Sequence, residues 1–174
     1  LEVVTPSPAE LAVPDCRHFG ACGGCSLRSL PYEAQLALKE EQVRSLLDSV
    51  LADACPEYIF EGIRRSPVTE GYRNKMEFSF GDEYKDGPLA LGLHKKGSFY
   101  DIVTVDGCRI VHEDFLRILS CTLSYFTELH ASYYHKQTHM GYLRHLVVRR
   151  AAATGDILIN LVTTSQETFP LAAL

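Results

Sequence analysis

The sequence has no tryptophan, only two methionines and fewer basic than acidic residues. Its 17 lysines and arginines against 22 aspartates and glutamates give a formal net charge of −5. Because nucleic-acid-binding domains are usually basic, this balance argues against a surface dedicated to nucleic acid and confines any such contact to local patches. No apolar run approaches the roughly 20 residues of a membrane-spanning helix, so no membrane partner is expected.

The N-terminal stretch LEVVTPSPAELAVP lacks both the basic segment and the apolar segment of a secretory signal, so we expect a cytoplasmic protein. The stretch is rich in proline and does not begin with methionine, and the last residues, SQETFPLAAL, resemble the first turns of a helix. These features predict the middle segment of a longer protein. Residues 1–15 would be a linker from a preceding domain, and residues 164–174 the start of a connection to a following one.

Apolar periodicity between these ends predicts an α+β fold. Leucine and valine at helical spacing predict a helix over residues 31–54, and residues 112–132 predict a second helix. Alternating patterns predict two hairpins, over residues 75–95 and 142–164, and an extended stretch with a turn over residues 98–110. We expect the hairpins to form one antiparallel sheet that packs against both helices, with a cysteine-rich loop beside it.

Three of the six cysteines, Cys16, Cys22 and Cys25, lie in one loop at residues 16–30 with the spacing C-x5-C-G-G-C. In a chain without a secretory signal, clustered thiols indicate metal or redox chemistry more often than disulfides. A four-iron cluster takes four thiolates, and structural zinc usually takes two C-x2-4-C pairs, of which this sequence has one. The spacing therefore favours an iron–sulfur cluster, with a zinc site and disulfides as the alternatives.

The fourth ligand must come from elsewhere in the chain. Cys108 is the favoured candidate, because it follows an Asp-Gly turn where a side chain can project from the end of a strand. Cys55 at the end of a helix and Cys121 within a helix are expected to be small buried hydrophobic residues. His18 could complete a zinc site, but a histidine beside a ligand is more often an ordinary loop residue.

Arg73 and Lys75, in the segment GYRNK, point to the same face of a predicted strand. Two cations on one face can clamp a phosphate or an unpaired base. A solvated strand face is an equally good interpretation of these residues alone. Arg73 is the better candidate of the two, because a guanidinium matches a phosphate or a base edge.

Lys95 and Lys96, in the segment LHKKGSFY, lie beside Phe99 and Tyr100. Basic and aromatic residues together can hold unstacked RNA. The alternative is a polar turn whose aromatic residues belong to the core, and for Phe99 and Tyr100 we favour this alternative.

The segment YLRHLVVRR carries Arg144, Arg149 and Arg150. Strand alternation predicts Arg144 and Arg150 on one face and Arg149 on the other. One of these faces is expected to contact RNA or another domain of the parent protein, and an exposed sheet edge is the alternative.

Three segments together, CRHFGACGGCSLRSLPYEAQLALKEEQV, GYRNKMEFSFG and DIVTVDGCRIVH, resemble the iron–sulfur RNA 5-methyluridine methyltransferases of the TrmA/RumA type. The similarity covers most of residues 14–163, and the resemblance implies that residues 31–163 are a central domain that contacts RNA. It implies a [4Fe-4S] cluster held by four cysteines: Cys16, Cys22, Cys25 and Cys108. It also favours RNA contact by Arg73 and Lys75. From the patterns described above we further expect Lys95, Lys96 and Arg144 to bind RNA.

Full-length members of that family add a Rossmann-like catalytic domain that binds S-adenosylmethionine and, in many cases, an N-terminal TRAM barrel. In them a cysteine thiolate attacks C6 of uracil, a methyl group is transferred to C5, and a glutamate base removes the C5 proton. Neither a glycine-rich adenosyl site nor the nucleophile motif is visible in this sequence, so we assign no catalytic residue and no S-adenosylmethionine ligand. The resemblance implies a parent enzyme that methylates uridine C5 in ribosomal or transfer RNA, of which this segment alone is inactive. We expect it to be a monomer.

Two other functions remain open on the sequence alone. One is an electron carrier of the ferredoxin type, although ferredoxins are short and dominated by their cluster, whereas most of this chain is ordinary α+β core. The other is a zinc-stapled interaction domain, although such a domain usually has a second C-x2-C pair.

Overall fold

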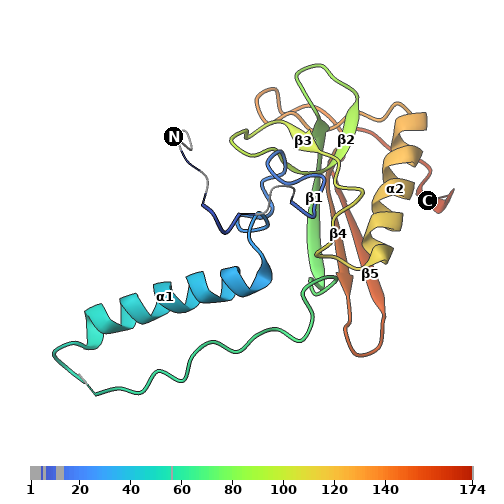
Figure 1. Cartoon of the computed structure of the whole chain (residues 1–174). Helices are drawn as coiled ribbons and strands as arrows, with labels where there is room; N and C mark the ends of the chain where they lie inside the picture. The colour runs from blue at the N-terminus through green and yellow to red at the C-terminus, as the bar shows by residue number, and fades with distance from the viewer. Residues whose placement is uncertain (1–4, 6, 11–13, 56, 174) are drawn as a thin grey trace. The chain divides into compact units, whose positions relative to one another are not determined.

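The computed structural model describes residues 5, 7–10, 14–55 and 57–173. The chain divides into two compact units, each made of two separate stretches. The first unit is Leu1–Asp15 with Ser26–Thr69, and the second is Cys16–Cys25 with Glu70–Leu174. The cysteine-rich stretch therefore folds with the sheet that follows it much later in the sequence (Figure 1).

The first unit contains one helix, α1 (Tyr32–Leu51), which begins directly after Pro31 as the sequence predicts. No residue of α1 is buried, and its side chains Leu46 and Val50 are 67% and 74% exposed. The predicted apolar stripe is therefore present but does not supply a core. Within the described residues no helix is long and apolar enough to cross a membrane.

The second unit contains a five-stranded sheet with the order β3-β2-β1-β4-β5, in which all neighbouring strands are antiparallel. The strands are β1 (Lys75–Asp82), β2 (Leu89–His94), β3 (Ile102–Val103), β4 (Leu143–Arg150) and β5 (Ile157–Thr163). Both predicted hairpins are confirmed as β1–β2 and β4–β5, and pairing of β1 with β4 joins them into one sheet. Strand β5 forms one edge and exposes three consecutive apolar side chains: Ile157, Leu158 and Ile159.

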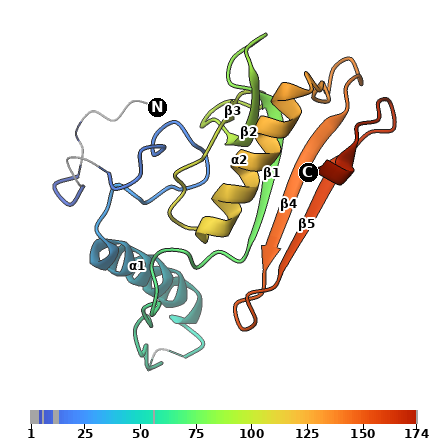
Figure 2. The ribbon, with the colours of Figure 1, turned by 90° about the vertical axis from the view of Figure 1, so that its right-hand side faces the viewer.

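The core of the second unit lies between the sheet and α2 (Glu113–Glu128), which covers one face of the sheet (Figure 2). Four buried residues of α2 follow helical spacing: Phe115, Leu119, Thr122 and Phe126. Three of them, Phe115, Leu119 and Phe126, belong to the same hydrophobic core as the strand residues Phe78, Leu91 and Leu146. The expected α+β fold with one antiparallel sheet is thereby confirmed. The expectation that both helices pack on the sheet was wrong, because α1 has no buried residue and contributes none to this core.

Two cysteines do not lie where the sequence predicted. Cys55 and Cys121 are both exposed rather than buried. Cys121 lies outside the apolar stripe of α2, and Cys55 follows α1, which buries nothing. The expectation that both are core residues was wrong because a cysteine in or after a helix is buried only when it falls on the packed face.

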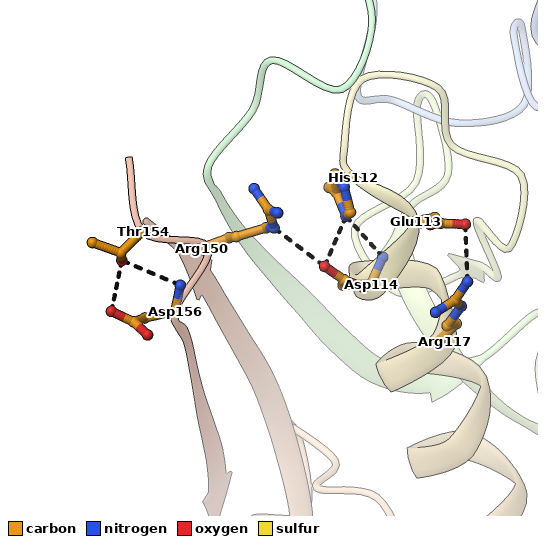
Figure 3. A network of polar contacts seen from close by, with 7 residues as sticks. All are labelled: His112, Glu113, Asp114, Arg117, Arg150, Thr154 and Asp156. Atoms are coloured by element: carbon orange, nitrogen blue, oxygen red, sulfur yellow. Dashed lines mark hydrogen bonds and ion pairs between the residues drawn. The ribbon is translucent and has the colours of Figure 1, made fainter. Parts of the chain in front are cut away.

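A network of polar contacts ties the end of β4 to the start of α2 (Figure 3). Arg150 donates from Nε to Oδ2 of Asp114 over 3.2 Å, and His112 caps the helix by accepting from the Asp114 N–H over 3.3 Å. Thr154 closes the β4–β5 turn by donating to Oδ2 of Asp156 over 2.6 Å. The Arg150–Asp114 pair thus links β4 to the first turn of α2, whereas the Thr154–Asp156 contact stays within the β4–β5 turn.

The last described residues differ from the expectation of an α-helix. They form a single 3₁₀ turn, Leu171–Ala173. Phe169 just before it packs edge-on against Phe126, with ring centroids 6.1 Å apart, and against Tyr142 at 5.0 Å. The segment is thus anchored by one aromatic side chain rather than by a helix face.

Candidate functional site

The cysteine loop continues the edge of the sheet at the end of β2. The Gly23 N–H donates to the carbonyl of His94 over 2.9 Å, and the Lys96 N–H donates to the carbonyl of Ala21 over 2.7 Å. Cys22 and Lys95 form an antiparallel bridge between these two bonds. The loop is therefore held by strand-like hydrogen bonds on a rigid element.

Both glycines between Cys22 and Cys25 allow this close approach. A Cβ atom on Gly23 would lie 3.0 Å from the carbonyl oxygen of His94, and one on Gly24 would lie 2.9 Å from a methyl carbon of Leu93. A larger residue at position 23 would press on the backbone of β2, and one at position 24 would displace the side chain of Leu93. The C-G-G-C sequence thus has a packing reason that is independent of any bound group.

A second set of contacts holds the loop against the Asp106-Gly107 turn. Nε2 of His18 accepts from the Gly107 N–H over 3.2 Å, and Arg17 pairs with Asp106 at 2.6 Å. The turn directly precedes Cys108, so this clasp brings a distant cysteine to the loop. Sequence analysis treated His18 as an ordinary loop residue, and nothing local signals a contact that spans 89 positions.

The four thiols that the sequence singled out converge at this place. Burial raises the pKa of the Cys22 thiol, and the charges of Cys108, Cys25 and Cys16 raise it further, in that order. The Gly24 N–H, which donates to Sγ of Cys22 over 3.3 Å, acts in the opposite direction on this pKa. The thiols of Cys16, Cys25 and Cys108 are thus each close enough to Cys22 for their charges to act on it.

The arrangement is anchored to the core but is not a closed metal site. Cys22, Cys25 and Cys108 pack against the hydrophobic core of the second unit. In the parts of the chain that the structure describes, no group of three or more His, Cys, Asp or Glu side chains has the geometry to hold a metal ion. The described side chains thus do not by themselves show a metal bound to these thiols.

Arg73 lies beside the segment that carries Cys108. Its N–H donates to the carbonyl of Ile110 over 2.8 Å, and it forms a parallel bridge with Val111. The Arg73 side chain is exposed and makes no ion pair with any described residue. Lys75, in contrast, pairs with Glu77 at 3.0 Å, and this contact lowers the pKa of the Glu77 carboxyl.

Lys95 and Lys96 lie next to the cysteine loop. Lys95 approaches Asp101 at 3.7 Å, whereas Lys96 is exposed and has no ion pair within the described ranges. Phe99 and Tyr100 are 84% and 60% exposed, so the expectation that they belong to the core was wrong. They lie in the connection between β2 and β3, outside the strands that face α2.

The start of β4 breaks the alternation on which the arginine prediction rested. Leu143 and Leu146 are both fully buried although they are three residues apart, because a β-bulge shifts the register there. Arg150 faces α2 and pairs with Asp114, while Arg144 is exposed beside the other hairpin. The expectation that Arg144 and Arg150 share one face was therefore wrong.

No protein-family model matches the chain. Curated relatives do match it over nearly its whole length. A protein from Caldanaerobacter subterraneus subsp. tengcongensis, described as an uncharacterized RNA methyltransferase, is 50% identical over 166 residues, which cover 95% of this chain and 36% of that protein. One from Clostridium acetobutylicum with the same description is 49% identical over 173 residues, which cover 99% of this chain and 37% of that protein.

Among solved structures, a tRNA (uracil-54, C5)-methyltransferase from Pyrococcus abyssi, in complex with S-adenosyl-L-homocysteine, matches with a TM-score of 0.67. The match has 23% identity and covers 95% of this chain and 35% of that one, so it shows a shared fold. The chain spans little more than a third of the length of the curated relatives it matches. It is therefore a homologue of one segment of the bacterial proteins described as RNA methyltransferases.

Proposed function

We propose that the chain is the cluster-binding, RNA-contacting segment of an S-adenosylmethionine-dependent methyltransferase that modifies uridine C5 in transfer or ribosomal RNA. The relatives described as RNA methyltransferases support the class of enzyme. The observation that carries the proposal is the clasp of His18 and Arg17 on the Asp106-Gly107 turn, which brings the segment with Cys108 to the loop Cys16–Cys25. S-adenosylmethionine and the catalytic groups belong, in this proposal, to other parts of the parent protein.

Cys16, Cys22, Cys25 and Cys108 would hold a [4Fe-4S] cluster, and the donor set fits it. Four thiolates are the usual ligands of such a cluster, and three of these cysteines already pack against the core. When bound, the cluster would cross-link the loop to the sheet by iron–thiolate bonds. Methyl transfer from S-adenosylmethionine to carbon needs no electron, so its expected contribution is structural support for RNA binding.

The first experiment is a metal analysis of the chain purified without oxygen. We expect about four irons and four sulfides per chain and a broad brown absorption. The variant Cys22→Ser should lose iron, and Cys121→Ser, which changes an exposed cysteine on α2, should keep it. One zinc with no iron would contradict the proposal and leave a zinc-stapled domain, and a reversible one-electron wave with transfer to a partner would favour an electron carrier.

The RNA-contacting surface would be made by the basic residues near the cysteine loop and the start of β4. Arg73, Lys96 and Arg144 are exposed and make no ion pair with the residues that the structure describes. Lys75 and Lys95 belong to the same proposal but each has an acidic neighbour, Glu77 or Asp101, that offsets its charge. A guanidinium or ammonium that is not already paired gives the larger gain when it meets a phosphate.

A further inference from the structure

The second unit contains a cavity of about 360 Å³ on the side of the first hairpin. It lies between the ends of β1 and β2, the β2–β3 connection and the segment 133–138 that precedes β4. The bulge at the start of β4 adds both Arg144 and His145 to its wall. Ligand cavities in proteins typically measure about 300–1,000 Å³, so this one suits a small occupant such as a single nucleotide.

Aromatic residues make up much of the lining. They are Phe99, Tyr100, Tyr133 and Tyr134, together with Phe80, whose ring packs in the core against Phe126. Phe99 at 84% and Tyr100 at 60% are unusually exposed for rings that touch a cavity, and Tyr100 accepts from Nε2 of Gln137 across the rim over 3.3 Å. Exposed rings beside a cavity provide a flat surface on which a base can stack.

The charged side chains around the cavity differ in whether they already have partners. Its acidic residues are Asp82, Asp86 and Asp101, and its permanent cations are Lys85, Lys136 and Arg144. The buried Asp82 accepts hydrogen bonds from the Asp86 N–H over 2.9 Å and from the Tyr133 hydroxyl. Burial raises the pKa of Tyr133, and the hydrogen bond to Asp82 raises it further.

The cations, in contrast, are available to a ligand. Lys85 and Lys136 make no ion pair with the residues described, and Arg144 lies 4.6 Å above the ring of Tyr134. An arginine over a tyrosine extends a stacking surface and leaves its donors at the edge. The cavity therefore combines flat aromatic rings with cations that have no acidic partner among the residues described.

Three histidines, His94, His135 and His145, also line the cavity. Burial lowers the pKa of His94 and of His145, and the charge of Lys136 lowers both further. Neutral imidazoles have one donor and one acceptor each, which matches the edge of a base better than it matches a phosphate.

We propose that this cavity holds one unpaired nucleotide of the RNA, with its base on the rings of Phe99 and Tyr100 and its phosphate near Lys85 or Lys136. The proposal rests on the proposed function for its RNA, and it adds a site apart from the four cysteines and from Arg73. Recognition would need a base that is not already stacked in a helix, as is usual when proteins read RNA. A loop or a flank of the modified uridine would supply such a base.

The test measures binding of a fluorescein-labelled, unstructured nine-nucleotide RNA to the whole chain, purified without oxygen, by fluorescence anisotropy. Phe99→Ala should weaken binding at least about fivefold, because a stacked base contributes substantially to affinity. Phe99→Trp, which keeps an aromatic ring, should bind the RNA about as tightly as the unchanged chain. The matched control is Tyr84→Ala, since Tyr84 is a ring of similar exposure, 60%, that does not line the cavity.

Three outcomes would overturn the proposal while RNA still binds. The Phe99→Ala chain could bind as tightly as the unchanged chain. It could lose as much affinity for the same RNA annealed to its complement, which would mean that no unpaired base is read. Uridine monophosphate could displace the labelled RNA as effectively as unlabelled RNA does at the same concentration of nucleotides, which would point to a free nucleotide as the ligand. If the unchanged chain binds no RNA at all, the proposed function fails together with this site.

Discussion

Arg73 is the residue whose surroundings best fit an RNA contact. It is exposed, lies beside the segment that carries Cys108, and makes no ion pair within the described parts of the chain. Lys75 has Glu77 at 3.0 Å. We predict that Arg73→Ala weakens RNA binding by the full-length parent about tenfold, in line with a lost charge-assisted hydrogen bond, and that Lys75→Ala weakens it less.

Filter binding at two salt concentrations would measure both effects. Arg73→Ala should also reduce the salt dependence of binding, because one phosphate contact fewer releases fewer counterions. Lys39→Ala, at an exposed position of α1, is the control and should change neither quantity. Equal affinity of the Arg73→Ala and unchanged proteins would remove Arg73 from the RNA surface.

His145 provides a prediction about stability and pH. Burial lowers its pKa below the ordinary value of 6.5, the Glu77 charge works against this, and Arg144 and the more distant Lys136 and His94 add to it. The folded chain therefore prefers the neutral imidazole, while the unfolded chain takes up a proton as the pH falls through 6.5. The contribution is fully present above pH 6.5 and is lost as the pH falls towards the lowered pKa.

We predict that the free energy of unfolding decreases between pH 7.5 and pH 5 more steeply in the unchanged chain than in His145→Gln. Urea unfolding at several pH values measures this difference. A loss of packing in the variant shifts its curve at every pH alike, so only the slope is diagnostic. Parallel curves for the two proteins would show that His145 does not titrate differently on folding.

At the residue scale the sequence was informative about chemistry and less so about exposure. The spacing of the cysteines and the Asp-Gly turn before Cys108 led to a set of four ligands that stays a prediction, and the thiols of Cys16, Cys25 and Cys108 all act on the charge of Cys22. The same reasoning misplaced Phe99, Tyr100, Cys55 and Cys121, which are exposed. Burial depends on which face of an element meets the core, and a residue type alone does not determine that face.

At the scale of elements, Gly92 shows how tightly β2 and β3 approach each other. A Cβ atom at this position would collide with the backbone carbonyl of Val103 in β3. We predict that Gly92→Ala destabilises the chain by about 1–3 kcal/mol, because backbone rather than a flexible side chain must move. Thermal unfolding measures this loss.

The control for this prediction is Ser79→Ala, at the β1 position paired with Gly92. It removes a hydroxyl that lies 3.4 Å from Nδ1 of His145 and leaves the β2–β3 approach unchanged, so it should destabilise the chain less than Gly92→Ala does. Because β3 pairs with β2 just past the bonds that hold the cysteine loop, Gly92→Ala should also lower the iron content. An alanine variant with unchanged stability would show that β3 can shift at little cost.

The elements themselves followed from the sequence where periodicity was strong. Both helices and both hairpins lie within the predicted ranges. The two-residue β3 is too short to produce a pattern. At the start of β4 two polar residues, Arg144 and His145, separate the buried Leu143 and Leu146, and strict alternation could not account for the bulge that this spacing requires. Local patterns predict elements, whereas short edge strands and bulges arise from pairing with a neighbour.

At the scale of the whole chain, the proposed cluster joins two stretches that are far apart in sequence. Cys22→Ser and Cys108→Ser would each break this cross-link, which closes a long loop of chain. We predict that each variant loses iron and lowers the melting temperature by about 5–15 °C. The double variant should be no less stable than either single one, because all three lack the same connection.

Differential scanning calorimetry without oxygen, alongside iron analysis, tests this prediction, with Cys121→Ser as the control. Additive losses in the double variant would mean that the two cysteines contribute through separate packing contacts. Unchanged melting temperatures with unchanged iron would contradict the assignment of these thiols as ligands.

The open edge of the sheet has a consequence for handling the protein. Strand β5 presents unpaired backbone groups along its outer side, together with the exposed side chains Ile157, Leu158 and Ile159. An edge that is both apolar and unprotected by charge is a template for another strand, and natural proteins usually blunt it with lysine or proline. Two copies of this chain can therefore pair edge to edge into a continuous sheet at high concentration. The substitution Leu158→Lys should prevent this aggregation.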